Sequence, residues 1–123
     1  MGDVSEKLVR RSFDSPDETR PFEQGMGEMQ ILNLAGGAAR GVFHPGWRWS
    51  EHVKPIAQTD SCQFTHLAYI ISGRMHIRMD DGTEEEFGTG DLMACPPGHD
   101  GWVVGEETCL LLDFGGPSTY AQR

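Results

Sequence analysis

Several features that would assign this 123-residue chain to a common class are missing from it. No apolar run approaches the ~20 residues that a membrane-spanning helix requires, and residues 1–20 lack the apolar segment of a signal peptide. We therefore expect a cytoplasmic protein with no membrane partner. Cysteine occurs only at Cys62, Cys95 and Cys109, with no CxxC pair. This spacing excludes a zinc-ribbon or thioredoxin-type motif and argues against a disulfide framework.

Basic residues are also scarce. Lys and Arg number 10 against 19 Asp and Glu, a net charge of -9 with neutral histidines. Nucleic acids and anionic membranes are bound through clustered Lys and Arg, so we expect neither as a partner. The phosphate-binding pattern GxxxxGK[ST] is absent as well, and so is the GxSxG pattern that carries the nucleophilic serine of α/β-hydrolases. The partner that remains is a small molecule.

Turn residues are abundant, with 16 Gly and 7 Pro, and they separate short apolar runs. The segment 74–80 alternates apolar and polar residues, as a half-buried strand does. Asp81-Gly82 is a tight-turn signal between that segment and the next, 84–87. Roughly eight such strands are expected along the chain. The pattern predicts an all-β sandwich or barrel.

The length favours a single domain. We divide the chain into a polar N-terminal arm, residues 1–28, and a β-barrel domain, residues 29–123. Within the arm, residues 3–13 could form a short helix, but we expect the arm to be extended or loosely ordered. It could also pack on a neighbouring subunit.

One stretch of turns resembles the second motif of the cupin family, which reads G-x5-P-x-G-x2-H. Residues 90–98 fit its G-x5-P-x-G portion, from Gly90 through Pro96 to Gly98. The histidine of the motif would stand at position 101, which is Gly101, whereas His99 directly follows the second glycine. The resemblance covers roughly residues 38–115. It implies a double-stranded β-helix, the jelly-roll barrel of cupins.

The first cupin motif, G-x5-H-x-H-x3,4-E-x6-G, fits in two alternative ways. Gly46 followed by His52 matches its start, and counting back from Gly73 puts His66 at the glutamate position, with a longer intervening chain. In a second register, Asp60-x-Cys62-x3-His66 overlays H-x-H-x3-E without an insertion. The sequence does not choose between His52 and Cys62.

The resemblance implies a metal site at the barrel mouth. His66 and His99, completed by His52 or Cys62, would hold one divalent transition metal. Imidazole suits iron, nickel, copper and zinc, while carboxylates shift the preference toward manganese. The implied activity is that of a metal-dependent oxygenase, isomerase or decarboxylase acting on a small organic acid or an aromatic compound. The alternative is a non-catalytic module that binds or senses a small ligand.

Aromatic and basic residues near the expected mouth are candidates for ligand binding. Trp49 and Trp102 would form pocket walls, and Arg78 would anchor a carboxylate. Tyr69 would contact the ligand or orient a metal-binding histidine. His76, between Met75 and Ile77, is expected to face solvent. Because edge strands need covering and small cupin barrels often pair, we expect a homodimer.

Overall fold

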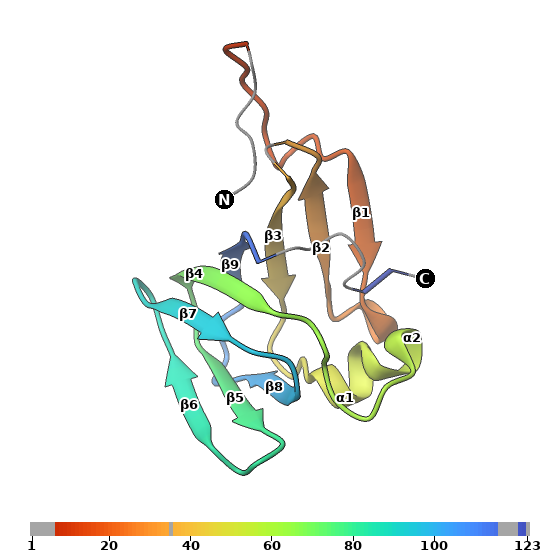
Figure 1. The fold of residues 1–123 in the computed structure, drawn as a ribbon, viewed down its shortest axis with the longest axis vertical. Helices are drawn as coiled ribbons and strands as arrows, with labels where there is room; N and C mark the ends of the chain where they lie inside the picture. Colours follow the sequence, from red (N-terminus) through yellow and green to blue (C-terminus); the bar gives the residue numbers. More distant parts are fainter. Residues whose placement is uncertain (1–6, 35, 116–120, 123) are drawn as a thin grey trace.

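A computed structural model describes residues 7–34, 36–115, 121 and 122, and these form two antiparallel β-sheets with two short α-helices (Figure 1). In chain order the elements are β1 (Glu18–Pro21), the 3-10 helix η1 (Glu23–Gly25), β2 (Gly27–Leu32), β3 (Ala38–Phe43), α1 (Trp49–His52), α2 (Lys54–Ala57), β4 (His66–Ser72), β5 (Met75–Met79), β6 (Glu84–Phe87), β7 (Leu92–Cys95), β8 (His99–Val103) and β9 (Cys109–Asp113). The predicted all-β jelly-roll architecture is confirmed.

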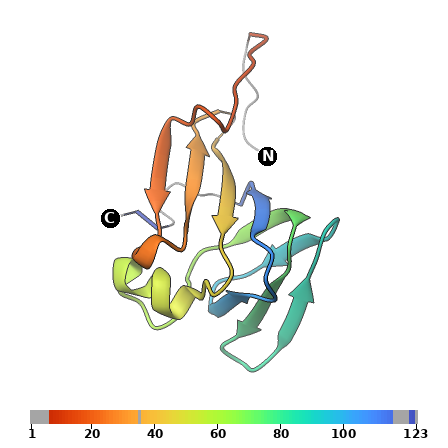
Figure 2. The same cartoon turned by 180° about the vertical axis from the view of Figure 1, so that it is seen from behind.

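The large sheet has the strand order β1-β2-β3-β9-β4-β7, and the small sheet has the order β6-β5-β8. β9 pairs with both β3 and β4, so this strand joins the two halves of the large sheet. The chain passes from one sheet to the other between β4 and β5, β6 and β7, β7 and β8, and β8 and β9, as in a jelly roll. Seen from behind, α1 and α2 lie together at one end of β1–β3 (Figure 2), where α1 contacts β8 and η1.

The turn and strand signals around β5 are confirmed. Met75 and Ile77 are buried and Arg78 is exposed, as alternation predicts for a strand with one covered face. The β5–β6 turn contains Gly82 at a φ of 94°. Asp81 stabilises this turn, because its carboxylate accepts a hydrogen bond from the backbone N–H of Thr83.

Part of the predicted N-terminal arm, residues 1–28, belongs to the large sheet. Residues 18–21 form β1, which pairs along its whole length with β2, and residues 27 and 28 begin β2, which pairs with β3. The alternation of Glu18–Pro21 is too short to be distinguished from a polar loop in the sequence. Residues 7–13 are not helical, and residues 3–6 of the predicted short helix lie outside the described residues.

The core lies between the two sheets and is closed at one end by α1. It contains Met29, Phe43 and Ile70 from the large sheet and Met75 from the small one, with Trp49 from α1. All three cysteines are buried, free and part of this core. Among the described residues, no helix has the length and apolar character needed to cross a membrane.

Gly73, in the β4–β5 turn, should be far less replaceable than the turn glycine Gly82. Gly73 has a φ of 77°, and an added Cβ would lie 2.6 Å from the Cα of Cys109, whereas nothing lies within 4 Å of a Cβ at Gly82. Gly82→Ala should lower the free energy of unfolding by about 1–2 kcal/mol, the cost of left-handed backbone alone. Gly73→Ala should cost about 3 kcal/mol or more, because the backbone must also shift. Urea denaturation measures both, and equal losses would contradict the close-contact argument.

Candidate metal centre

Cys62, His66 and His99 form a compact group in which the three donor atoms lie within 4.8 Å of one another. His66 is the first residue of β4 in the large sheet, and His99 is the first residue of β8 in the small sheet. Cys62 precedes β4 and forms an isolated β-bridge with His99. The site therefore lies where the two sheets meet.

Backbone hydrogen bonds hold these segments in register. The N–H of Cys62 donates to the carbonyl of His99 at 2.7 Å, and the N–H of Gly98 donates to the carbonyl of Cys62 at 2.7 Å. Gly98 has a φ of 92°, a conformation that favours glycine, and it turns the chain so that His99 enters β8. Along β4, His66 shares the inner face with Ala68 and Ile70, as the period-2 pattern predicts.

Both imidazole rings are oriented by oxygen acceptors at Nδ1. His66 Nδ1 lies 2.6 Å from Oδ2 of Asp113, and His99 Nδ1 lies 2.9 Å from the carbonyl of Pro96. An oxygen acceptor requires N–H at Nδ1, so the neutral form of each ring has its lone pair on Nε2. His66 Nε2 is 3.6 Å from Cys62 Sγ. A carboxylate that hydrogen-bonds the far nitrogen of a histidine is the usual support of a metal-binding imidazole.

Asp113 contacts His66 of this group, and the sequence analysis did not select it. It is buried on the inner face of β9, and its Oδ1 also accepts the backbone N–H of Gly115 at 2.9 Å. The signal that could have identified it is an acidic residue at the inward position of an apolar strand, 109–113, where a charge is costly unless it is paired. The sequence analysis assigned the orienting role to Tyr69 instead.

Burial controls the protonation of the metal-free group. It raises the pKa of the Cys62 thiol to about 12, because a thiolate is poorly solvated there. Burial, together with repulsion from the neighbouring His66, lowers the pKa of His99 to about 4. At neutral pH, His99 is therefore a neutral imidazole with its lone pair available. The Cys62 thiol must lose its proton to bind an ion.

The donor set fits a transition metal. An ion with metal–sulfur and metal–nitrogen distances of about 2.3 and 2.0–2.1 Å in tetrahedral geometry separates the two ligand atoms by about 3.5 Å. The separation between Cys62 Sγ and His66 Nε2 is 3.6 Å. One thiolate and two imidazoles favour zinc, copper or iron over manganese, which prefers oxygen ligands.

A narrow cavity of about 30 Å³ adjoins the group. Gly101, which replaces the histidine of the family pattern, lies on its wall, and a Cβ there would come within 2.9 Å of Ile77. We call this cavity the chamber. Its lining residues are Met29, Phe43, Trp47, Trp49, His66, Met75, Ile77, Met93, His99, Gly101, Leu111 and Asp113.

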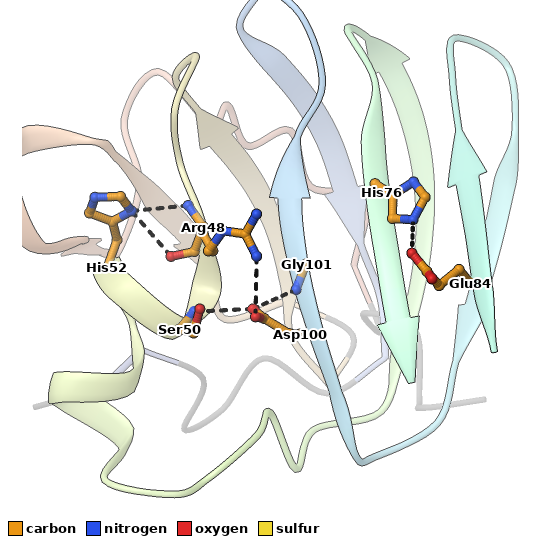
Figure 3. Close-up of polar contacts among 7 residues, drawn as sticks. All are labelled: Arg48, Ser50, His52, His76, Glu84, Asp100 and Gly101. Carbon is orange, nitrogen blue, oxygen red and sulfur yellow. Dashed lines mark hydrogen bonds and ion pairs between the residues drawn. The ribbon is translucent and has the colours of Figure 1, made fainter. Parts of the chain in front are cut away.

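His52, the alternative to Cys62, lies apart from this group. It ends α1, and its Nδ1 lies 3.0 Å from the backbone nitrogen and 3.1 Å from the carbonyl oxygen of Arg48 (Figure 3). The segment 49–57 forms two helical turns, so the β-strand spacing assumed by the motif does not apply there. The sequence left His52 and Cys62 open as the third member of the group. The structure places Cys62, and not His52, beside His66 and His99.

Of the four candidate ligand-binding residues, one lies at the chamber and three face outward. Trp49 lines the chamber, together with Trp47. Tyr69 on β4 and Arg78 on β5 are exposed on the outer faces of their sheets. Trp102 also faces outward from β8, because Gly101 and Val103 take the inward positions of that strand.

The outer face of the small sheet carries its own polar and aromatic cluster. The ring of Trp102 stacks on His76 at 4.7 Å, and the guanidinium of Arg48 lies 4.2 Å from the Trp102 ring centroid. His76 Nε2 lies 2.7 Å from Glu84, and Asp100 accepts the backbone N–H of Ser50, which ties α1 to β8 (Figure 3). His76 is thus engaged outside the chamber, and Asp100 supports the helix rather than a metal ligand.

The two sheets define a protein of the jelly-roll class with a candidate metal centre where they meet, and a family match agrees with that class. The model of the EutQ-like cupin domain matches residues 47–110, more than half of the chain. The protein therefore belongs to the EutQ-like cupin family. No curated protein sequence matches the chain significantly.

Solved structures with the same fold are only distantly similar in sequence. A protein of unknown function from Rhizobium leguminosarum has a TM-score of 0.62 at 17% identity, covering 87% of this chain and 94% of its own. A sugar phosphate isomerase of the cupin superfamily from Silicibacter pomeroyi has a TM-score of 0.57 at 19% identity, covering 85% and 73%. The oxalate decarboxylase of Lactobacillus farciminis, in a formate complex, has a TM-score of 0.61 at 16% identity, but the match covers 95% of this chain and only 35% of that enzyme.

Acid should destabilise the metal-free protein through His99. Its pKa falls from 6.5 to about 4 on folding, so below pH 6.5 the unfolded chain binds a proton that the folded protein does not. The free energy of unfolding is then complete above about pH 6.5 and decreases as the pH falls toward 4, by up to about 3 kcal/mol. Urea titrations in the presence of a chelator measure this dependence.

The matched variants are His99→Asn and His76→Asn. His99→Asn should flatten the decrease between pH 6.5 and 4, whereas His76→Asn, which alters a ring on the outer face, should keep the decrease attributed to His99. An unchanged slope in His99→Asn would show that other groups cause the acid sensitivity.

Proposed function

We propose that this cupin binds one divalent transition metal through Cys62, His66 and His99. The observation that carries the proposal is the shared orientation of the two imidazoles. Each ring has its Nδ1 held by an oxygen acceptor and therefore its Nε2 lone pair available, and the buried thiol of Cys62 lies within 4.8 Å of both rings. Structural zinc sites commonly have four protein ligands, while a set of three leaves a position for water or substrate.

The proposed activity is metal-dependent chemistry on a small organic acid, of the oxygenase, isomerase or decarboxylase class. A bound ion supplies Lewis-acid polarisation of a substrate oxygen. Cys62, His66 and His99 would hold it, while Asp113 keeps the His66 ring in the required tautomer. Two structurally similar proteins are named as an oxalate decarboxylase and a sugar phosphate isomerase, which supports the class. The narrow chamber favours a small acid over an aromatic compound.

A second candidate is a non-catalytic module that binds or senses a small ligand. One observation favours it: apart from His66, His99 and Asp113, every residue lining the chamber is apolar, glycine or tryptophan. Within the described part of the chain, the chamber thus offers no further side chain for proton transfer. Elemental analysis of protein purified without a metal-affinity tag separates the candidates, because a stoichiometric redox-active metal favours the enzyme and its absence favours the sensor.

Cobalt binding tests the metal site directly. Metal-free protein should bind Co²⁺ at a ratio of one to one and develop near-ultraviolet absorption from charge transfer between thiolate and cobalt. Cys62→Ser should lose that absorption. His66→Ala and His99→Ala should each lose stoichiometric metal, because two remaining ligands do not hold an ion tightly.

Two further variants extend this experiment, one at a supporting residue and one as a control. Asp113→Asn should weaken cobalt affinity about 10- to 100-fold, because the carboxylate orients His66 without contacting the ion. His76→Ala should leave cobalt affinity unchanged, since its ring is engaged by Glu84 on the outer face. Cobalt absorption that survives Cys62→Ser would refute the thiolate ligand.

We also propose that the protein is a homodimer in the cytoplasm, joined through the outer face of β4 and β7. Leu67, Tyr69 and Ile71 on β4 are exposed, and Leu92 on β7 lies opposite Tyr69. A contiguous exposed apolar face is typical of an interaction surface.

Charge placed on this face should separate the subunits. Leu92→Glu should convert a dimer into a 13.6 kDa monomer in sedimentation experiments, because a carboxylate would be buried without a partner. Leu8→Glu, which changes an exposed residue of the N-terminal segment, is the matched control and should remain dimeric. A wild-type protein that sediments as a monomer at micromolar concentration would refute the interface.

A further inference from the structure

A second cavity lies between the free edges of the two sheets. In the described part of the chain, β6 is an edge strand of the small sheet and β7 is an edge strand of the large sheet. Both lie on the side of the barrel away from β1 (Figure 1, Figure 2). The cavity between them measures about 390 Å³, and its lining residues all fall within 77–96. We call it the edge groove. Its volume is in the range of sites that hold small organic molecules.

The floor of the edge groove is apolar and open to solvent. Ile77 and Met79 of β5, Phe87 of β6 and Cys95 of β7 all line it. Ile77 and Cys95 are buried, while Met79 and Phe87 are half-buried and pack against the core. An apolar ligand on this floor would displace water from these side chains, which is favourable in proportion to the area covered.

Strand register places one glutamate beside this floor. Glu85 lies opposite Ile77, and directly opposite residues of an antiparallel pair project from the same face of a sheet. Glu86, the next residue, projects from the other face, where it accepts a hydrogen bond from Arg74 at 3.3 Å. Glu85 has no hydrogen bond or ion pair to any residue that the structure describes. It therefore presents a solvent-accessible carboxylate to the edge groove.

The rim of the edge groove is negatively charged. Asp81 and Glu84 line it together with Glu85, and no Lys, Arg or His is among the described residues that do so. We propose that the edge groove binds a small organic ammonium ion. Its apolar chain lies on Met79 and Phe87, and its N–H groups donate to Glu85. An organic anion would be repelled by the rim, and an inorganic cation would leave the apolar floor in water. The proposal does not depend on the metal centre.

Hexylammonium is the probe that tests this proposal on the full chain. In ¹⁵N-labelled protein, hexylammonium chloride should shift the backbone amide signals of Glu85, Phe87 and Cys95 in a saturable manner, while the signals of β1 stay in place. Butylammonium should bind about tenfold more weakly, because it buries two fewer methylene groups. Hexanoate, which has the same chain with the opposite charge, and methylammonium, which has the charge without the chain, should produce no saturable shift at equal ionic strength.

Glu85→Gln and Glu86→Gln are matched variants. Each removes one negative charge from the same strand, but only Glu85 lines the edge groove. Glu85→Gln should weaken hexylammonium binding about threefold to fivefold, as expected for an ion pair open to solvent. Glu86→Gln should leave the affinity unchanged. Both residues are exposed, so neither variant should unfold the barrel. Equal weakening by the two variants would assign the effect to net charge and overturn the proposal.

The remaining outcomes separate this site from other occupants and from the metal centre. The titration is repeated with a chelator present, and the same saturable shifts should persist if the amine does not bind a metal. Shifts that grow linearly with hexylammonium overturn the proposal. So do amide signals of β6 and β7 that change with protein concentration but not with hexylammonium, because a second copy of the chain then covers the groove. If zinc does not bind and hexylammonium still saturates these signals, the metal site fails and the edge groove stands.

Discussion

The short bridge between Cys62 and His99 is the interaction on which the site depends. Its two strongest hydrogen bonds, each 2.7 Å, join the segment before β4 to the start of β8, so they connect the large sheet to the small one at the chamber. The side chains of Cys62 and His99, which project from this bridge into the barrel, are therefore held close together. Without it, a thiol and an imidazole that lie 37 positions apart in the sequence would have no reason to meet.

The buried polar side chains around the bridge have hydrogen-bond partners. Asp113 engages both His66 and Gly115, and His99 engages the carbonyl of Pro96. These bonds offset the cost of placing ionisable groups in an apolar barrel, and they also assign the tautomers. The same contacts therefore stabilise the fold and orient both imidazoles of the candidate metal centre, so the stability of the fold and the arrangement of this centre have a common structural origin.

The departures of this chain from the cupin pattern are explained by local structure. Residues 49–57 fold into α1 and α2, which carries His52 toward the backbone of Arg48 and leaves the position beside His66 to Cys62. Gly101 occupies the inward position of β8 where the pattern has a histidine, and the close approach of Ile77 leaves little space for a side chain there. The result is a group with one sulfur and two nitrogen donors, softer than a set of histidines and a glutamate.

The sequence by itself determined the strand alternation of 74–80, the Asp81-Gly82 turn, the inner face of His66 and the turn that precedes His99, because each depends on neighbours within a few residues. It also indicated the jelly-roll class, since turn spacing reflects strand length. Local patterns could not choose between His52 and Cys62, could not place Trp102 outside the chamber and gave no reason to select Asp113. Those outcomes depend on which strands pair across the two sheets, and β9 brings Asp113 beside β4 only when the barrel closes. Long-range pairing, which a short-range pattern does not encode, decided the composition of the site.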